Sequence, residues 1–306
     1  MTLDVKIDPT DPNRWETYYQ VYDIPPWDSQ AAASQLVHYL TSSCELLPAP
    51  IGNSNHIPDG LDIHGRARGA TNDKIHVCSK CRRFKPPVNG RVLEFACGTA
   101  SSLLYMSQLG FTVVGIELVE KPVTQARNMA LQLGIPSHRA IILQHDLFQL
   151  PDTFSVAVAE RMLKSSQPDI PQQASSTAAS TSNGIKTSIA TLWKSIAHPL
   201  TSKFDFIYDC QCFHVLRRVN QEGLLHKYET YLKPKTGLLM LLVGRTSTPS
   251  LIAGGMPVMT EDEIRTCFDE KAWDILFLVT TFFDDTVEYI KNGKKSPAWW
   301  MLARRR

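Results

Sequence analysis

Carboxylate side chains follow short apolar runs at several places along the chain. The run that starts at Arg91 ends in the small-residue turn Glu94–Ser101, and Glu117 ends the next, β-branched run. Small residues let backbone amides approach a ligand closely, and a carboxylate after the second run can accept both hydroxyls of a ribose. Asp146 follows a third run, where it can meet the amino group of adenine. Together these positions predict a site for an adenosine-containing cofactor.

These runs belong to a predicted alternation of strands and helices. Strands are expected at residues 91–96, 111–117, 140–143, 204–209 and 237–243. One helix is expected at 99–109, and a second follows the strand that ends at Glu117 and closes at Gly134. Thr260 and Glu263 form a capping box at the start of a further helix. Two final strands, 273–283 and 299–303, are joined by a connection containing Asn292-Gly293. The predicted fold is a doubly wound α/β structure, with a seven-stranded, mostly parallel sheet and a terminal antiparallel hairpin.

Composition excludes several classes of protein. The chain has 306 residues, of which 43% are hydrophobic, and a net charge of +2. No apolar run is long enough to cross a membrane, and the small net charge gives no clear signal for nucleic acid. The seven cysteines are irregularly spaced, and the first residues lack a secretory signal. We therefore expect a cytoplasmic protein with free thiols.

Two segments lack the pattern of a packed core. We divide the chain into an N-terminal helical cap of the active site (1–46), a basic irregular insertion (47–90) and the main domain (91–306), which contains a Ser/Thr-rich, disordered loop at about 165–188. Cys78 and Cys81 have half the spacing of a zinc knuckle, but no second Cys-x-x-Cys pair exists, so no metal site is predicted. The basic insertion is either solvated surface or a contact for an acidic partner.

The successive motifs resemble those of class I S-adenosylmethionine (SAM)-dependent methyltransferases. The matching segments are Val92–Ala100, Val114–Glu117, His145-Asp146-Leu147 and Phe204–Asp209. The Pro-Trp-Asp element within Tyr22–Asp28 and the segment Cys212-Phe213-His214 are similar to the thiopurine methyltransferase-like branch. The resemblance runs from about Trp15 to Ala303 but includes neither long loop.

This resemblance implies SAM as cofactor and a set of site residues. The implied cofactor-binding residues are Trp27, Glu94, Ala96, Gly98, Glu117, Leu118, Asp146, Leu147 and Asp209. Trp27 would cap the donor, because an aromatic face attracts a sulfonium. Asp209 and His214 are the implied catalytic residues, with His214 the candidate general base. The alternatives are a strand-end cap for Asp209, a core aromatic for Trp27 and a structural role for His214.

Three positions depart from the family pattern. Ala96 and Ala100 replace the first and last glycines of the usual glycine-rich turn, which keeps only Gly98. Alanine can replace glycine where φ is negative, so we expect donor binding to survive, although it could be looser. Cys210 stands where the thiopurine branch often has an arginine, which counts against a thiopurine-like substrate.

The predicted function is methyl transfer from SAM to a small-molecule acceptor, a soft nucleophile such as a thiol. Cys210 and Cys212 could bind a soft acceptor such as trivalent arsenic, although small apolar fillers are the favoured interpretation. Methylation of a protein or RNA, with the basic insertion as docking surface, and a non-catalytic SAM-fold scaffold are the alternatives. A nicotinamide oxidoreductase fits less well, because the glycine spacing fails at Ala96 and Ser101. The sequence does not determine the oligomeric state.

Overall fold

The computed structural model describes residues 12–22, 24–25, 27–41, 84–166, 203–246, 257–286 and 296–306. Most of the expected basic insertion and of the Ser/Thr-rich loop lies outside these ranges, as do Cys78, Cys81 and the Asn292-Gly293 connection. The expectations for those segments therefore stay predictions.

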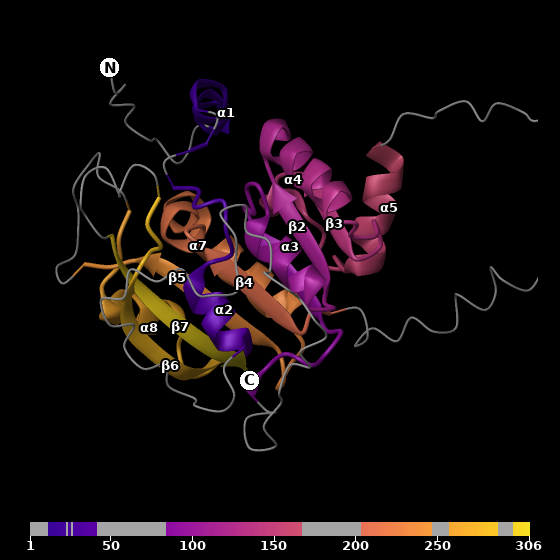
Figure 1. Ribbon diagram of the computed structural model, residues 1–306. Coiled ribbons are helices and arrows are strands. Elements are labelled where there is room, and N and C mark those ends of the chain that lie inside the picture. Colours follow the sequence, from indigo (N-terminus) through magenta and orange to yellow (C-terminus); the bar gives the residue numbers. More distant parts are fainter. Residues whose placement is uncertain are drawn as a thin grey trace, which may run out of the picture.

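Seven strands form one sheet in the order β3-β2-β1-β4-β5-β7-β6 (Figure 1). The parallel strands are β1 (Arg91–Phe95), β2 (Thr112–Glu117), β3 (Ala140–Gln144), β4 (Phe206–Cys210) and β5 (Leu238–Gly244). The last two, β6 (Trp273–Phe282) and β7 (Pro297–Arg305), are antiparallel to each other, and β7 is antiparallel to β5. The predicted fold class is confirmed. Because the strand order reverses between β1 and β4, a crevice is expected at their carboxyl ends.

Helices cover both faces of the sheet, which explains why its central strands are apolar on both sides. On one face, α2 (Ser34–Thr41), α3 (Ser101–Gln108) and α4 (Glu120–Gln132) share a core with alternate strand residues such as Val92 and Phe206. On the other, α5 (Val156–Ser166), α7 (Phe213–Tyr231) and α8 (Glu261–Cys267) pack on the intervening residues such as Leu93 and Ile207. Among the helices that the structure describes, α1 (Pro12–Val21) lies beside α4 (Figure 1).

Local sequence signals fix several element boundaries. The capping box is present at the start of α8, where Thr260 accepts from the backbone of Glu263 and Glu263 accepts from the backbone of Thr260. Gly110 and Gly134 follow α3 and α4 with positive φ, as residues that end helices commonly do. One irregularity lies inside α7, where Asn220 has φ −157° and kinks the helix. That kink separates the first turns of α7, which face the crevice, from the part that packs on the sheet.

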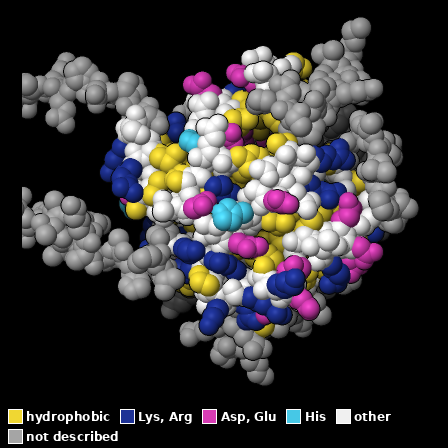
Figure 2. All heavy atoms as spheres, turned by 180° about the vertical axis from the view of Figure 1, so that it is seen from behind, with side chains coloured by type: hydrophobic (Ala, Val, Ile, Leu, Met, Phe, Trp, Pro, Cys, Tyr) yellow, Lys and Arg dark blue, Asp and Glu magenta, His cyan; other side chains and the backbone are white. Residues whose placement is uncertain are grey.

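The face opposite to that of Figure 1 carries charges of both signs. In the part of this face that the described residues form, Lys and Arg side chains alternate with Asp and Glu (Figure 2). Among the described helices, none is long and apolar enough to cross a membrane.

Candidate functional site

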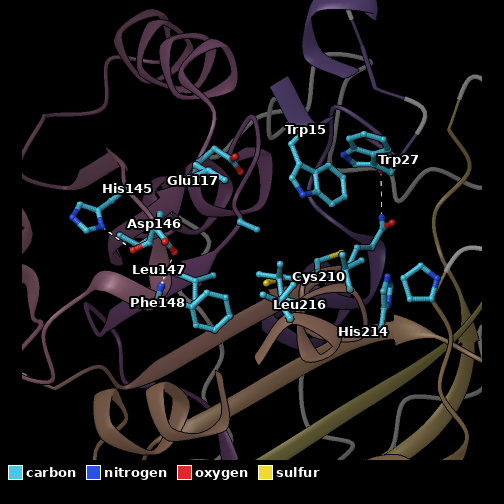
Figure 3. A pocket seen from close by; sticks show the side chains of 18 of the residues that line it. Trp15, Trp27, Glu117, His145, Asp146, Leu147, Phe148, Cys210, His214 and Leu216 are labelled. Carbon is cyan, nitrogen blue, oxygen red and sulfur yellow. Dashed lines mark hydrogen bonds between the residues drawn. The ribbon is translucent and has the colours of Figure 1, made fainter. Parts of the chain in front are cut away.

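A cavity of about 490 Å³ opens at the carboxyl ends of the central strands (Figure 3). One half is lined from β1, β2 and the turn after β3, and we call it the donor half; it includes Ala96, Glu117 and Leu147. The other half is lined by Trp15, Trp27 and the start of α7, including His214 and Leu216, and we call it the acceptor half. The cavity volume is typical of a pocket for a small molecule.

Glu117 anchors the donor half. It ends β2 and is buried, and its Oε2 accepts a hydrogen bond from Gly98 N at 3.0 Å while its Oε1 accepts one from Val119 N at 3.0 Å. Burial raises the pKa of Glu117, and these backbone donors act in the opposite direction. The two carboxylate oxygens together have about four acceptor positions, so the backbone donors leave acceptor capacity for a ligand hydroxyl. The geometry is therefore compatible with a ribose diol.

A second carboxylate, Glu94, lies beneath the turn. Its side chain is buried, and Oε2 has no hydrogen-bond partner among the described residues. Burial raises the pKa of Glu94 well above its usual value, and the charges of Asp209 and Glu117 raise it further. An unpartnered buried oxygen is unfavourable unless a ligand completes it. A ligand ammonium group, such as that of the donor's methionine part, would supply the missing hydrogen bond, so the residues present fit SAM.

The turn after β1 is strained at both alanines. Ala96 has φ +47°, Gly98 +54° and Ala100 +60°. The expectation that alanine stands here because φ is negative is wrong, since all three residues adopt the left-handed conformation. That conformation costs a non-glycine residue about 1–2 kcal/mol. Ala96 is also exposed and lines the cavity, so its methyl group occupies part of the donor half.

Asp146 and its neighbours close the far end of the donor half. The Oδ1 of Asp146 accepts from Phe148 N at 2.9 Å and so caps the short 3-10 helix η2 (Leu147–Gln149). Leu118 and Leu147 line the same end, and Leu118 is 40% exposed. An apolar slot beside a helix-capping carboxylate suits a flat aromatic ring with a polar edge, such as adenine.

The N-terminal segment forms one wall of the cavity. Trp15 and Trp27 both line it, in edge-to-face contact with ring centroids 5.5 Å apart (Figure 3). Asp28 accepts a hydrogen bond from the Thr99 hydroxyl at 2.8 Å, which ties this wall to the turn after β1. The hydroxyl of Tyr19 is so near Gly98 that a Cβ there would lie 3.1 Å from it. The segment therefore packs directly over the donor turn.

Asp209 does not line the cavity. Its side chain is completely buried, and its Oδ1 accepts from Cys212 N at 3.2 Å and Phe213 N at 3.0 Å, at the start of α7. Its Oδ2 accepts from the hydroxyl of Tyr228. Burial raises the pKa of Asp209 to about 6, against the lowering effect of these hydrogen bonds. The observed contacts hold the start of α7 in place, and Asp209 itself does not reach the cavity.

His214, in contrast, lines the acceptor half. Its Nδ1 accepts a hydrogen bond from Gly244 N at 2.8 Å, so the ring hydrogen must lie on Nε2. Burial lowers the pKa of His214 to about 3, and the charges of Arg217 and Arg218 lower it further. At neutral pH the ring is uncharged, and as a base it is far too weak to remove a proton from a thiol or hydroxyl.

The two cysteines beside the site are protonated small side chains. Both line the cavity, and burial raises the pKa of Cys210 and of Cys212 above the usual value. In this protonated state they act as small apolar side chains of the cavity wall. Among the described residues, no group of three His, Cys, Asp or Glu side chains could hold a metal ion.

The structure thus brings most of the predicted site residues to one cavity. Its lining includes Trp27, Ala96, Glu117, Leu118, Asp146, Leu147 and His214. Glu94 and Gly98 lie directly behind this lining, next to Glu117. Sequence reasoning missed Trp15, Tyr19, Gln211 and Leu216, which line the cavity. The aromatic residues spaced along 15–22 were the available signal for the first two.

A family model described as a methyltransferase domain matches residues 64–277, which is most of the chain. Among curated proteins, the S-adenosyl-L-methionine-dependent Diels-Alderase iccD of Talaromyces variabilis is 31% identical over 64 residues, which span 21% of this chain and 22% of that protein. The match therefore covers less than a quarter of the relative's length.

Two solved structures are among those similar to this chain. One, from work on the conversion of a disulfide bond into a thioacetal group during echinomycin biosynthesis, has a TM-score of 0.54 at 14% identity and covers 96% of this chain and 92% of that one. TehB from Haemophilus influenzae has a TM-score of 0.46 at 14% identity, with 77% and 64% covered. At such identities the first likeness shows the fold alone.

Proposed function

This chain belongs to the methyltransferase-domain family, and from that premise we propose that it methylates a small, largely apolar molecule at a soft nucleophilic atom, such as a thiol sulfur. The cofactor is S-adenosylmethionine, which supplies an electrophilic methyl group when bound. Membership of the narrower thiopurine methyltransferase-like branch stays a prediction.

In this proposal the donor half holds SAM through residues of the first three strands. Glu117 accepts the ribose hydroxyls, and the unpartnered Glu94 Oε2, directly behind the cavity lining, accepts from the ammonium group of the donor. Leu118, Asp146 and Leu147 receive adenine, while Ala96 and Gly98 provide the backbone turn beside the methionine part. Trp27 lies over the opposite wall, where an aromatic face stabilises a sulfonium and excludes water.

The acceptor half suits an apolar substrate. Val215, Leu216 and Pro257 line it together with Trp15 and Trp27. The exposed apolar side chain of Val219 stands on the same lining. Removing such a surface from water favours a molecule with little charge. Size and enclosure favour a small molecule over a protein or RNA chain.

A single observation supports the soft nucleophile: the imidazole that lines the acceptor half is not available as a base. His214 has its Nδ1 occupied by Gly244 N, and its pKa is lowered to about 3 by burial. The site is therefore suited to a methyl acceptor that does not transfer a proton to a protein side chain during the reaction. Catalysis then rests on in-line positioning, which can supply up to about 7–11 kcal/mol.

Asp209 affects the reaction indirectly. We assign it to positioning, because its carboxylate holds Cys212 N and Phe213 N and so fixes the turn that presents His214. The general-base role first expected of His214 is replaced in this proposal by contact with the acceptor.

A second candidate function is cyclisation of an apolar substrate with SAM bound but not consumed. The favouring observation is again His214, a neutral hydrogen-bond donor in an apolar cavity, an arrangement that polarises a carbonyl without proton transfer. The short match to a SAM-dependent Diels-Alderase agrees with it. A scaffold without turnover is the remaining alternative.

Calorimetric titration with SAM, followed by a methyl-release assay on a panel of small thiols, phenols and amines, tests the proposal. We expect saturable SAM binding and transfer to thiols in preference to phenols and amines. A compound with a tethered diene and dienophile is incubated in parallel, and its conversion to an isomer without gain of a methyl group would support the cyclase. SAM binding without methyl transfer to the panel and without isomerisation of that compound would count against an enzyme of either kind.

A further inference from the structure

His214 has one polar atom that the protein does not use. Its side chain is 1% exposed, and Nδ1 is committed to Gly244 N at 2.8 Å. Nε2 therefore carries the hydrogen, and it has no partner among the described residues. The ring is held by an edge contact with Phe283, with centroids 6.2 Å apart. Because His214 lines an apolar cavity, a ring N–H without a protein partner marks a place where a ligand acceptor is expected.

The surroundings restrict what that acceptor can be. Leu216, Val215 and Pro257 line the cavity beside His214. Arg217, on the same helix, is paired with Glu263 at 2.8 Å, and neither it nor Arg218 lines the cavity to neutralise an anionic ligand. A neutral oxygen acceptor fits this setting, since burying an unpaired charge would be far more costly.

We propose that His214 determines substrate specificity: its Nε2–H donates a hydrogen bond to a carbonyl-type oxygen on the small apolar acceptor. This inference rests on the proposed function and deepens it, because it defines the substrate class as an apolar molecule that carries a carbonyl oxygen near the methylated atom. Asp209 and Gly244 are the supports of this donor, one fixing the helix start and the other fixing the tautomer.

Two substitutions separate the two nitrogens of the ring. In His214→Asn the amide oxygen can still accept from Gly244 N, but no donor reaches the position of Nε2. In His214→Gln the amide nitrogen can reach that position and restores a donor. His214→Asn thus keeps the contact with Gly244 N and removes the hydrogen-bond donor to the ligand. His214→Gln, which restores that donor, serves as its matched control.

The probes are acetophenone and α-methylstyrene, which differ only by oxygen against methylene and carry no methyl-accepting group. Their dissociation constants are measured by ligand-observed NMR on the full chain saturated with S-adenosylhomocysteine. We expect the ratio of the ketone's constant to the alkene's to rise about five- to tenfold in His214→Asn and to stay near the wild-type ratio in His214→Gln. An unchanged ratio in folded His214→Asn overturns the proposal, as does wild-type protein that binds neither probe.

These outcomes are independent of turnover. A selective response to the ketone in a protein that methylates nothing on the panel would count against the proposed methyl transfer only. If the protein transfers methyl groups but the ratio of the two dissociation constants is the same in His214→Asn as in wild type, the result would count against this inference only. A melting temperature measured on both variants shows that each binding result refers to folded protein.

Discussion

Ala96 shows how a single methyl group can affect backbone and ligand together. It has φ +47° and faces the donor half of the cavity, where a glycine would avoid the strain and leave more room. His214 is a comparable case, because one backbone contact decides which nitrogen carries the hydrogen. The sequence shows the residue type at both positions. The effect of Ala96 depends on its backbone conformation, whereas the tautomer of His214 depends on a contact with β5.

Ala96→Gly should raise both stability and donor affinity. Relief of the left-handed strain exceeds the added chain entropy of glycine by about 0.5–1 kcal/mol, which corresponds to about 1–4 °C in melting temperature. The control is Lys235→Gly, an exposed residue with φ +65° that does not line the cavity. It should raise the melting temperature and leave SAM affinity unchanged. Equal SAM affinity in Ala96→Gly and wild type would show that the methyl group does not restrict the donor.

At the scale of elements, two pieces far apart in sequence build the acceptor half. The start of α7 supplies one wall, and the segment containing Trp15 and Trp27 supplies the other. Gln211 Nε2 donates to Trp27 O at 3.3 Å, and Asp28 accepts from Thr99, so the N-terminal wall is bound to both the turn after β4 and the donor turn.

Thr99→Val should loosen the N-terminal wall without altering the shape of the turn. It removes the hydroxyl that donates to Asp28, so we expect SAM affinity to fall about five- to tenfold and cleavage by protease within residues 12–30 to become faster. Thr266→Val, which removes an exposed hydroxyl bonded within α8, is the matched control. If both variants bind SAM as wild type does, the contact with Asp28 does not stabilise the donor site.

The order of elements could be predicted from the sequence because apolar runs and helix signals are local. Glu117 and Asp146 were placed correctly at one edge, since parallel strands end at the same side of a sheet. The contact between Asp28 and Thr99 joins positions 71 residues apart, and that between His214 and Gly244 joins positions 30 apart. No local pattern encodes such pairings, so the tautomer of His214 and the N-terminal wall could not be predicted.

At the scale of the whole molecule, burial of several carboxylates links donor binding to pH. Burial raises the pKa of Glu94, Glu117 and Asp209, the last to about 6. A cationic donor favours their ionised forms, so its binding should release protons and should strengthen as the pH rises through the raised pKa values of these groups. Calorimetry in buffers of different ionisation enthalpy measures this release. S-adenosylhomocysteine lacks the sulfonium charge and should release fewer protons; equal release by both ligands would exclude the cluster as the cause.

The shifted pKa values of Asp209 and His214 make folding stability depend on pH in opposite directions. For Asp209, whose folded pKa is raised, the stabilising contribution is present below about pH 4 and is lost as the pH rises through about 6. For His214, whose folded pKa is lowered to about 3, the contribution is present above about pH 6.5 and is lost as the pH falls. The two therefore partly cancel between about pH 4 and 6, which makes donor binding a better probe of the cluster than unfolding is.

The central claim is that methyl transfer proceeds without a protein base. It is tested most directly by the pH dependence of kcat/KM for a series of aromatic thiols of different acidity. Labelled SAM is present in saturating amounts, and the pH is varied only over the range in which SAM binding is complete. The account predicts that each profile rises with the thiolate fraction and that its midpoint follows the pKa of the thiol. One midpoint shared by all thiols, and abolished in His214→Asn, would contradict it.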